Sequence, residues 1–95
     1  MHRLEWKPIA EEDLAGIIDF IAEDSPASAE RLAADLRAKA EKMREHPEMY
    51  RLGSRRGTRE MVVHPNYIVI YRVLKKAGVV EILRVKHAAQ KRKTT

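Results

Sequence analysis

The sequence predicts a single α+β domain in which an N-terminal strand precedes an antiparallel helical hairpin and a three-stranded antiparallel meander. Apolar residues recur at helical spacing over residues 9–44, and segments rich in Val, Ile and Tyr follow residue 57, with turn residues between them. A chain of 95 residues buries about 60–65% of the surface that it exposes when unfolded, which suffices for one modest core. We expect the domain to span residues 1–90 and residues 91–95 to form a basic tail.

The first part of the chain predicts a short strand and a helix. Leu4, Glu5 and Trp6 alternate in polarity, and Pro8 suits the first turn of a helix. The apolar residues that follow lie at i, i+3, i+4 and i+7, and they are Leu14, Ile17, Ile18 and Ile21. This spacing predicts a helix over residues 9–23 with one buried face.

A second helix is predicted directly after the first. Ser25 can cap it, Pro26 fits its first position, and Pro47 follows its end. One side carries mostly small residues, which allow a close helix pair: Ala29, Leu32, Ala33, Leu36, Ala40 and Met43. The alternative of a membrane-binding helix pair is disfavoured because the polar faces are acidic and mixed rather than basic.

Residues 57–73 predict a β-hairpin that turns at residues 64–66, His-Pro-Asn. A two-residue loop would pair Val62 with Val69 and Arg59 with Arg72, whereas a three-residue loop would flip one strand relative to the other. With the two-residue loop, one face carries Val62, Tyr67, Val69 and Tyr71, and the other carries Arg59, Met61, Val63, Ile68, Ile70 and Arg72. Residues 79–87 predict the third strand, and residues 48–56 a loop with the basic cluster Arg51, Arg55 and Arg56.

Charge is divided sharply along the chain. Residues 1–50 contain 7 Lys and Arg against 12 Asp and Glu, whereas residues 51–95 contain 12 against 2. The sheet half therefore has a balance of +10, which favours a polyanion or an acidic protein as partner. The alternative is that these cations only solvate strand edges and the tail.

Composition excludes several kinds of site. The chain has no cysteine, so disulfides, thiolate metal sites and cysteine nucleophiles are excluded. The four histidines show no metal-ligand spacing, and we expect neither metal nor cofactor. Neither a membrane-spanning run nor a signal peptide is present, which leads us to expect a cytoplasmic protein.

Two groups of residues could act on an anion. Arg59 and Arg72, as cross-strand neighbours, would repel unless a phosphate or carboxylate lay between them; otherwise both extend into water. His87 ends the third strand near Arg84 and Lys86, whose charge favours a neutral imidazole able to accept a proton in RNA cleavage. A structural role is the alternative for His87, and His64 is best explained by the turn.

The order of elements and four segments resemble the RelE/ParE superfamily of bacterial toxins over residues 3–90. The segments are Gly57–Glu60, His64–Tyr67, Tyr71–Val73 and Ile82–His87. The resemblance implies a growth-inhibiting toxin of a type II toxin–antitoxin module, bound by a cognate antitoxin in a hetero-oligomer. An acidic amphipathic antitoxin segment would cover the second apolar sheet face, Met61, Val63, Ile68 and Ile70.

The residues resemble the ParE branch more than the RelE branch. Ribonuclease members place an Arg where Ile68 stands, and the loss of such a charge-assisted phosphate contact costs about 1.5–3 kcal/mol. ParE-like members are linked to inhibition of DNA gyrase and to plasmid maintenance, without being enzymes. The target contacts would then be Arg59, Arg72, Arg84, His87, Lys91, Arg92 and Lys93.

The alternative that the resemblance leaves open is a RelE-like ribosome-dependent mRNA endoribonuclease, with the ribosome and mRNA as partners. Its catalytic residues would be His87, Arg59 and Arg84. A module whose toxicity has decayed, leaving antitoxin binding alone, is a third alternative. The basic tail departs from the ParE branch, in which an aromatic-Pro ending is common.

Overall fold

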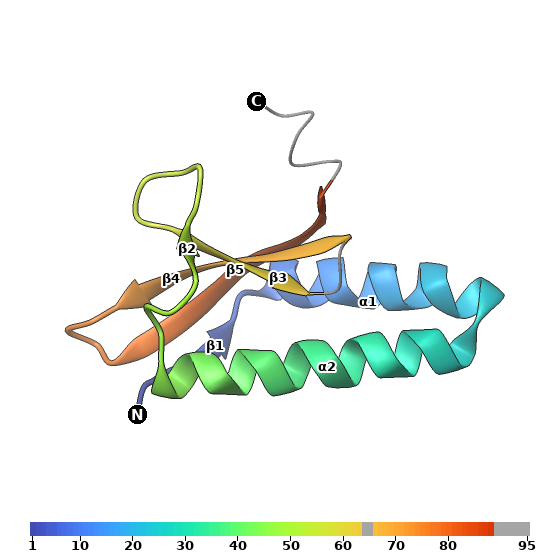
Figure 1. The fold of residues 1–95 in the computed structure, drawn as a ribbon, viewed down its shortest axis with the longest axis horizontal. Helices are drawn as coiled ribbons and strands as arrows, with labels where there is room; N and C mark the ends of the chain where they lie inside the picture. Colours follow the sequence, from blue (N-terminus) through green and yellow to red (C-terminus); the bar gives the residue numbers. More distant parts are fainter. Residues whose placement is uncertain (64–65, 89–95) are drawn as a thin grey trace.

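The structure, a computed structural model, describes residues 1–63 and 66–88. Its elements lie in the predicted order, with a short additional strand before the hairpin (Figure 1). They are β1 Arg3–Trp6, α1 Pro8–Asp24, α2 Pro26–Glu45, β2 Arg51–Leu52, β3 Arg59–Val63, β4 Tyr67–Leu74 and β5 Val79–His87. The predicted helices and the predicted third strand are confirmed to within about a residue at their ends. The helix ends could be predicted because the Pro and Ser residues that mark them act locally.

The strands form one five-stranded sheet in the order β1-β5-β4-β3-β2. β1 runs parallel to β5, and the other neighbours are antiparallel. The α+β class and the meander β3-β4-β5 are therefore confirmed. The prediction of a patternless loop over residues 48–56 is corrected, because Arg51 and Leu52 pair with β3 and extend the sheet by a strand.

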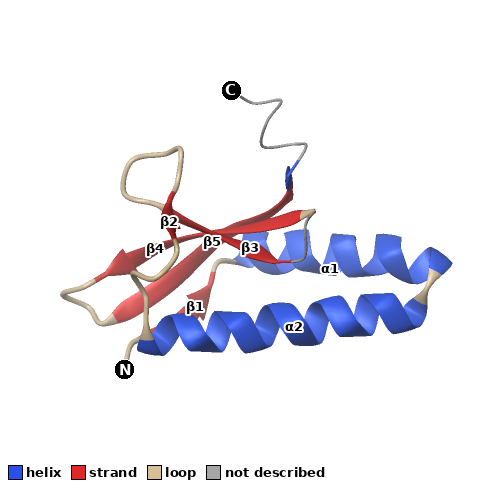
Figure 2. Cartoon of the chain, in the orientation of Figure 1, coloured by secondary structure: helices blue, strands red, loops and turns tan. Residues whose placement is uncertain are grey.

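The two helices lie side by side and cover one face of the sheet (Figure 2). The Ser28 N–H donates to the Ser25 side chain at 3.2 Å, so Ser25 caps α2 as the sequence predicts. Apolar residues of both helices pack on apolar residues of the sheet. The fully buried side chains of this core include Leu14, Leu36 and Met43 from the helices and Met61, Val63, Val69, Tyr71, Val80 and Ile82 from the strands. Burial of this face holds the two layers together.

The hairpin register differs from the two-residue loop that the sequence predicts. Met61 pairs with Val69 and Val63 with Tyr67, so three residues, 64–66, connect the strands. Arg59 consequently lies opposite Tyr71 and not opposite Arg72. A shift by one residue moves a whole strand to the other face, which is why the predicted grouping of side chains fails.

The face of the hairpin turned toward the helices therefore combines residues from both predicted sets. Met61 and Val63 are 0% exposed and belong to the core with Val69 and Tyr71. The opposite face carries Val62, paired with Ile68, and Ile70, paired with Glu60. Neither helix of the described part of the chain is long and apolar enough to cross a membrane.

Candidate functional site

The second half of β5 pairs with β4 on one side, and on the other side no strand of the described residues accompanies it. β1 accompanies β5 only as far as Ile82, where the Lys7 N–H donates to the Ile82 carbonyl at 2.9 Å before α1 begins. Beyond this point Asp13 of α1 takes the place of a strand. The Val85 N–H donates to its Oδ2 at 3.0 Å, so a helix side chain satisfies a strand-edge donor.

Asp13 also holds Arg84 in a bidentate pair. Arg84 donates from Nε to Oδ2 at 2.8 Å and from Nη2 to Oδ1 at 3.1 Å. Burial by itself raises the pKa of Asp13, but the hydrogen bonds from Arg84 and Val85 and the charges of Arg84 and Lys86 bring that pKa below its usual value. The hydrogen bond to Asp13 likewise raises the pKa of Arg84, although burial lowers it.

A β-bulge lies beside this pair. Ile70 pairs with Arg84, yet Tyr71 pairs with Ile82, so Leu83 has no partner on β4. A bulge of this kind bends and twists a strand. It coincides with the point at which β5 leaves β1 and first meets Asp13.

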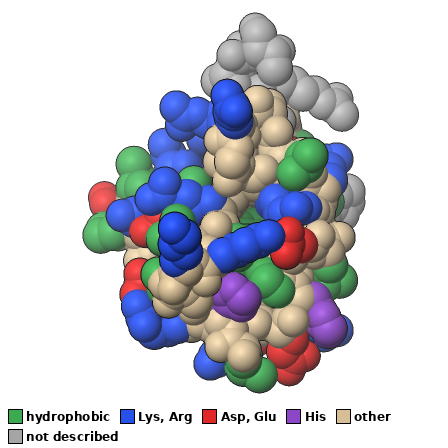
Figure 3. Space-filling model, turned by 90° about the vertical axis from the view of Figure 1, so that its left-hand side faces the viewer, with side chains coloured by type: hydrophobic (Ala, Val, Ile, Leu, Met, Phe, Trp, Pro, Cys, Tyr) green, Lys and Arg blue, Asp and Glu red, His purple; other side chains and the backbone are tan. Residues whose placement is uncertain are grey.

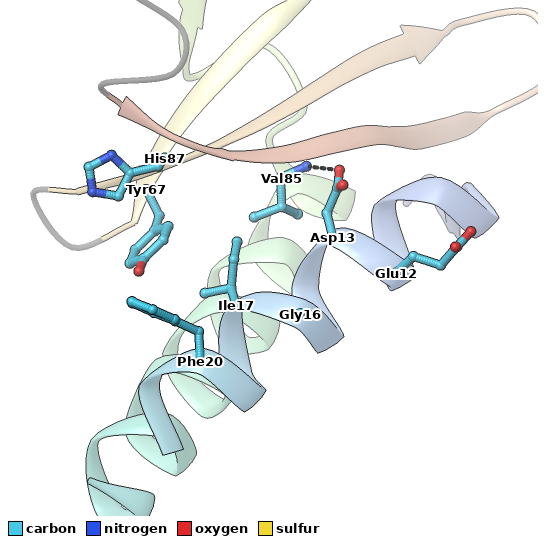
Figure 4. Close-up of a pocket in the computed structure, with 8 residues that line it drawn as sticks. All are labelled: Glu12, Asp13, Gly16, Ile17, Phe20, Tyr67, Val85 and His87. Atoms are coloured by element: carbon cyan, nitrogen blue, oxygen red, sulfur yellow. Dashed lines mark hydrogen bonds between the residues drawn. The ribbon is translucent and has the colours of Figure 1, made fainter. Parts of the chain in front are cut away.

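A pocket of about 510 Å³ opens between α1 and the end of β5. Figure 4 shows Ile17 and Phe20 of α1 pointing toward Tyr67 and Val85 across it. The remaining lining residues are Glu12, Asp13, Gly16 and His87. Phe20 is 70% exposed, so the pocket has an open apolar rim.

His87 lies at one end of this pocket. It pairs with Tyr67 across the strands, and the two rings meet edge to face with their centroids 5.4 Å apart. This position confirms that His87 ends the third strand. The aromatic contact packs its imidazole against the Tyr67 ring.

The structure separates the three residues of the ribonuclease alternative. His87 aligns with Tyr67 and Val63, whereas Arg59 lies at the other end of β3. Four residues along a strand and two strands across place the Cα atom of Arg59 roughly 16 Å from the Cα atom of His87. Arg84, between them in register, is held by Asp13.

Arg59 and Arg72 do not form the predicted anion site. Arg59 donates to the backbone carbonyls of Tyr50 at 2.7 Å and Glu48 at 3.3 Å. Arg72 lies opposite Glu81 and donates to its carboxylate at 2.6 Å, with Lys7 at 3.2 Å on the same carboxylate. The observed register gives each guanidinium an acceptor from the chain itself, so no bridging anion is required.

The residues expected to bind an antitoxin divide between two faces. Met61 and Val63 are sealed beneath the helices, as described above. Ile68 and Ile70 lie on the opposite face, where Val62 is 44% exposed and Ile68 only 5%. Residues 91–93 and His64 fall outside the described residues.

Sequence reasoning missed Asp13. Asp13 lies in the first turns of α1 together with Glu11 and Glu12, where the helix dipole favours negative charge, and no local pattern distinguishes it from them. Asp13 is distinguished only in the folded chain, where α1 crosses the edge of β5 and brings its carboxylate to Arg84 and Val85. Among the described residues no group of three His, Asp or Glu side chains could hold a metal ion.

Comparison with known families and proteins gives consistent results. A family model described as the ParE toxin of the type II toxin–antitoxin system, parDE, matches residues 4–92. Toxin RelE2 of Caulobacter vibrioides is 40% identical over 85 residues, which are 90% of this chain and 91% of that protein.

Solved structures share the fold. The chromosomal ParDE toxin–antitoxin system of P. aeruginosa contains a chain that superposes with a TM-score of 0.77 at 21% identity, covering 92% of this chain and 96% of that one. The intact E. coli RelBE toxin–antitoxin complex gives 0.64 at 16% identity, covering 93% and 98%. At these identities the similarity shows the fold alone.

Proposed function

Because the chain belongs to the ParE toxin family of type II toxin–antitoxin systems, we propose that it arrests bacterial growth by acting on DNA gyrase through contact rather than catalysis. A cognate antitoxin neutralises it in the cytoplasm. Arg59, Arg72, Arg84 and His87, with residues 91–93 beyond the described part, stay candidates for target contact.

The separation of His87 from Arg59 is the observation that carries this proposal. Metal-free RNA cleavage needs a proton acceptor within hydrogen-bond reach and cations free to stabilise the phosphate in the transition state. The two arginines proposed for that task are instead held by acceptors within the chain, Arg84 by Asp13 and Arg59 by two carbonyls. This arrangement favours a surface that binds over a site that cleaves.

A ribosome-dependent mRNA endoribonuclease is the second candidate. The relative named RelE2, at 40% identity, favours it, as does the position of His87 in a pocket with Tyr67. In this case His87 would act as the proton acceptor, and Arg84 would have to exchange Asp13 for the phosphate.

Pulse labelling of DNA and protein synthesis, begun within minutes of inducing the chain without its antitoxin, distinguishes the two candidates. We expect DNA synthesis to fall first. Protein synthesis falling first would overturn the gyrase proposal.

A variant pair adds a second criterion to the labelling experiment. His87→Ala should weaken the arrest of DNA synthesis only in part, because His87 is one of several candidate contact residues. The control His46→Ala, which removes an exposed imidazole after α2, should leave the arrest unchanged. Abolition of toxicity by His87→Ala alone, with loss of mRNA cleavage, would instead establish the ribonuclease.

For the antitoxin we propose the sheet face opposite the helices, centred on Val62 and Ile70. Val62 is 44% exposed, and the half-buried Ile70 continues the apolar surface on β4, whereas Ile68 is only 5% exposed. Met61 and Val63 cannot contribute, because they are 0% exposed. A Val62→Asp chain should remain toxic but escape rescue by co-expressed antitoxin; rescue equal to that of the parent chain would contradict this surface.

A further inference from the structure

The loop between β2 and β3, residues 53–58, presents two arginines to solvent. Arg55 and Arg56 are both exposed, and neither guanidinium has an ion pair or a side-chain hydrogen bond within residues 1–63 and 66–88. The loop projects from the sheet on the side away from the helices (Figure 1). Its tip therefore carries two positive charges that no described residue offsets.

The loop is built rigidly beneath these arginines. The Gly53 N–H donates to the Thr58 carbonyl at 2.8 Å, and the Thr58 hydroxyl donates to the Arg55 carbonyl at 2.7 Å. Gly57 has φ +81°, in the left-handed region that favours glycine. A side chain at Gly53 would collide with the Thr58 hydroxyl, which is itself buried. This backbone keeps Arg55 and Arg56 at the tip.

The anions near the loop are already engaged. Glu60, 4% exposed, lies 3.3 Å from Arg51 and accepts from the Ser54 N–H. Glu48 lies 3.7 Å from Arg59 and 3.3 Å from Lys75. These two carboxylates are thus paired with Arg51, Arg59 and Lys75. Figure 3, which views this end, shows Lys and Arg side chains gathered over the sheet.

We propose that the β2–β3 loop binds the phosphodiester backbone of a nucleic acid through Arg55 and Arg56. A guanidinium donates two parallel hydrogen bonds to a phosphate, and neighbouring phosphates of a backbone can engage both arginines. The tip itself, Ser54–Gly57, carries no apolar or aromatic anchor of the kind that centres a protein interface, and the exposed Leu52 lies at the base of the loop, in β2. The contact is independent of base sequence, because it reads phosphates alone.

This inference goes beyond the proposed function and holds for either target, since gyrase acts on DNA and the ribosome consists largely of RNA. Both sources present the same chemistry to the loop. Arg59, Arg72 and Arg84, which the sequence offered for target contact, have acceptors within the fold. Among the described arginines at this end, Arg55 and Arg56 have neither an ion pair nor a side-chain hydrogen bond within the described residues.

The test measures binding of the full chain to two fluorescent probes, a 20-base-pair DNA duplex and an RNA hairpin of equal charge, over a range of KCl concentrations. The Arg55→Ala/Arg56→Ala variant should bind about tenfold more weakly at 0.1 M salt. Its slope of log K against log salt should fall by about 2, since each phosphate contact contributes about 0.9. Loss on DNA, on RNA or on both supports the proposal and identifies the source.

A matched control is Arg31→Ala/Lys42→Ala, which removes two exposed cations from α2 and lowers the formal net charge from +5 to +3, as the loop variant does. Its affinity should change less than twofold. An equal loss in both variants would show a general charge effect and overturn the proposal. The Arg55→Lys/Arg56→Lys variant should restore the salt slope, because it keeps both positive charges.

Three further results would overturn the proposal. They are a parent chain that binds neither probe, an alanine variant that binds as the parent does, and equally tight binding of poly-glutamate, which would indicate an acidic protein partner. Arrest of DNA synthesis by a chain that binds neither probe would overturn this inference alone and leave the proposed function standing.

Discussion

The edge of β5 and the β2–β3 loop both carry arginine, but within the described residues the charge is paired at the edge and unpaired in the loop. At the β5 edge, Asp13 accepts both hydrogen bonds of Arg84. In the loop, Arg55 and Arg56 have no carboxylate partner within the described residues. The comparison shows that the excess of +10 in the second half of the sequence overstates the surface available to a partner, because much of it stabilises the fold.

The two regions also differ in where their backbone N–H groups find hydrogen-bond acceptors. The β5 edge takes its acceptor from a helix distant in sequence, since Asp13 and Val85 are 72 residues apart. The loop forms its backbone hydrogen bonds between residues close in sequence, such as the bond from the Gly53 N–H to the Thr58 carbonyl. A change at the first region should therefore disturb tertiary structure, and a change of side chain at the tip of the second should not.

The largest effect is expected from Asp13→Ala. It leaves the Val85 N–H and the Arg84 guanidinium without their acceptor, and we expect the free energy of unfolding to fall by about 2 kcal/mol. This value is at the low end for bonds to a charged group because the Arg84 side chain is 39% exposed. Urea denaturation at pH 7 measures it.

The control for Asp13→Ala is Asp19→Ala, which removes an exposed carboxylate from the same helix. It should leave the urea midpoint nearly unchanged. Equal midpoints for the two variants would show that Asp13 does not stabilise the β5 edge.

A smaller effect is expected from acid. The pKa of Asp13 is lower in the folded chain than its ordinary 3.8, so the folded state binds fewer protons and the stabilisation is complete above about pH 4 and lost as pH falls through the folded pKa. The difference in unfolding free energy between the parent and Asp13→Asn should be constant from pH 7 to 5 and narrow below pH 4. If the difference in unfolding free energy between the parent and Asp13→Asn stayed constant down to the lowest pH at which both fold, the lowered pKa of Asp13 would be contradicted.

The smallest effect on stability is expected from Arg55→Ala/Arg56→Ala. Exposed side chains without partners usually change the free energy of unfolding by less than about 0.5 kcal/mol. Thermal unfolding should therefore coincide with that of the parent while nucleic-acid affinity falls. Substantial destabilisation would show that Arg55 and Arg56, like Arg84, stabilise the fold.

Local patterns predicted most of the architecture. The Ser25-Pro26 restart located the boundary between the helices, and the apolar run after Gly78 gave the third strand its observed ends, Val79–His87. The hairpin register could not be predicted, because two-residue and three-residue turns at residues 64–66 both suit the sequence. That single uncertainty moved Met61 and Val63 from the predicted partner surface into the core.

The candidate site was less predictable, since it depends on contacts between distant segments. The sequence identified His87 as the end of a strand, but it could not show Tyr67 beside it or Arg59 roughly 16 Å away. Nor could it show which arginines find acceptors. The pairing of Arg84 with Asp13 requires that α1 cross the edge of β5, and the pairing of Arg72 with Glu81 requires the register of β4 and β5.

The parallel pairing of β1 with β5 has a consequence for the order of folding. Arg3 pairs with Val79 and Trp6 with Ile82, so β1 can form these pairs only after β5 has been synthesised. Contacts so distant in sequence slow folding, because the intervening loop must close before they form. Since β5 also lies between β1 and β4, a nascent chain that lacks it has neither a complete sheet nor the edge that Asp13 covers. Toxicity should therefore arise only after β5 has been synthesised.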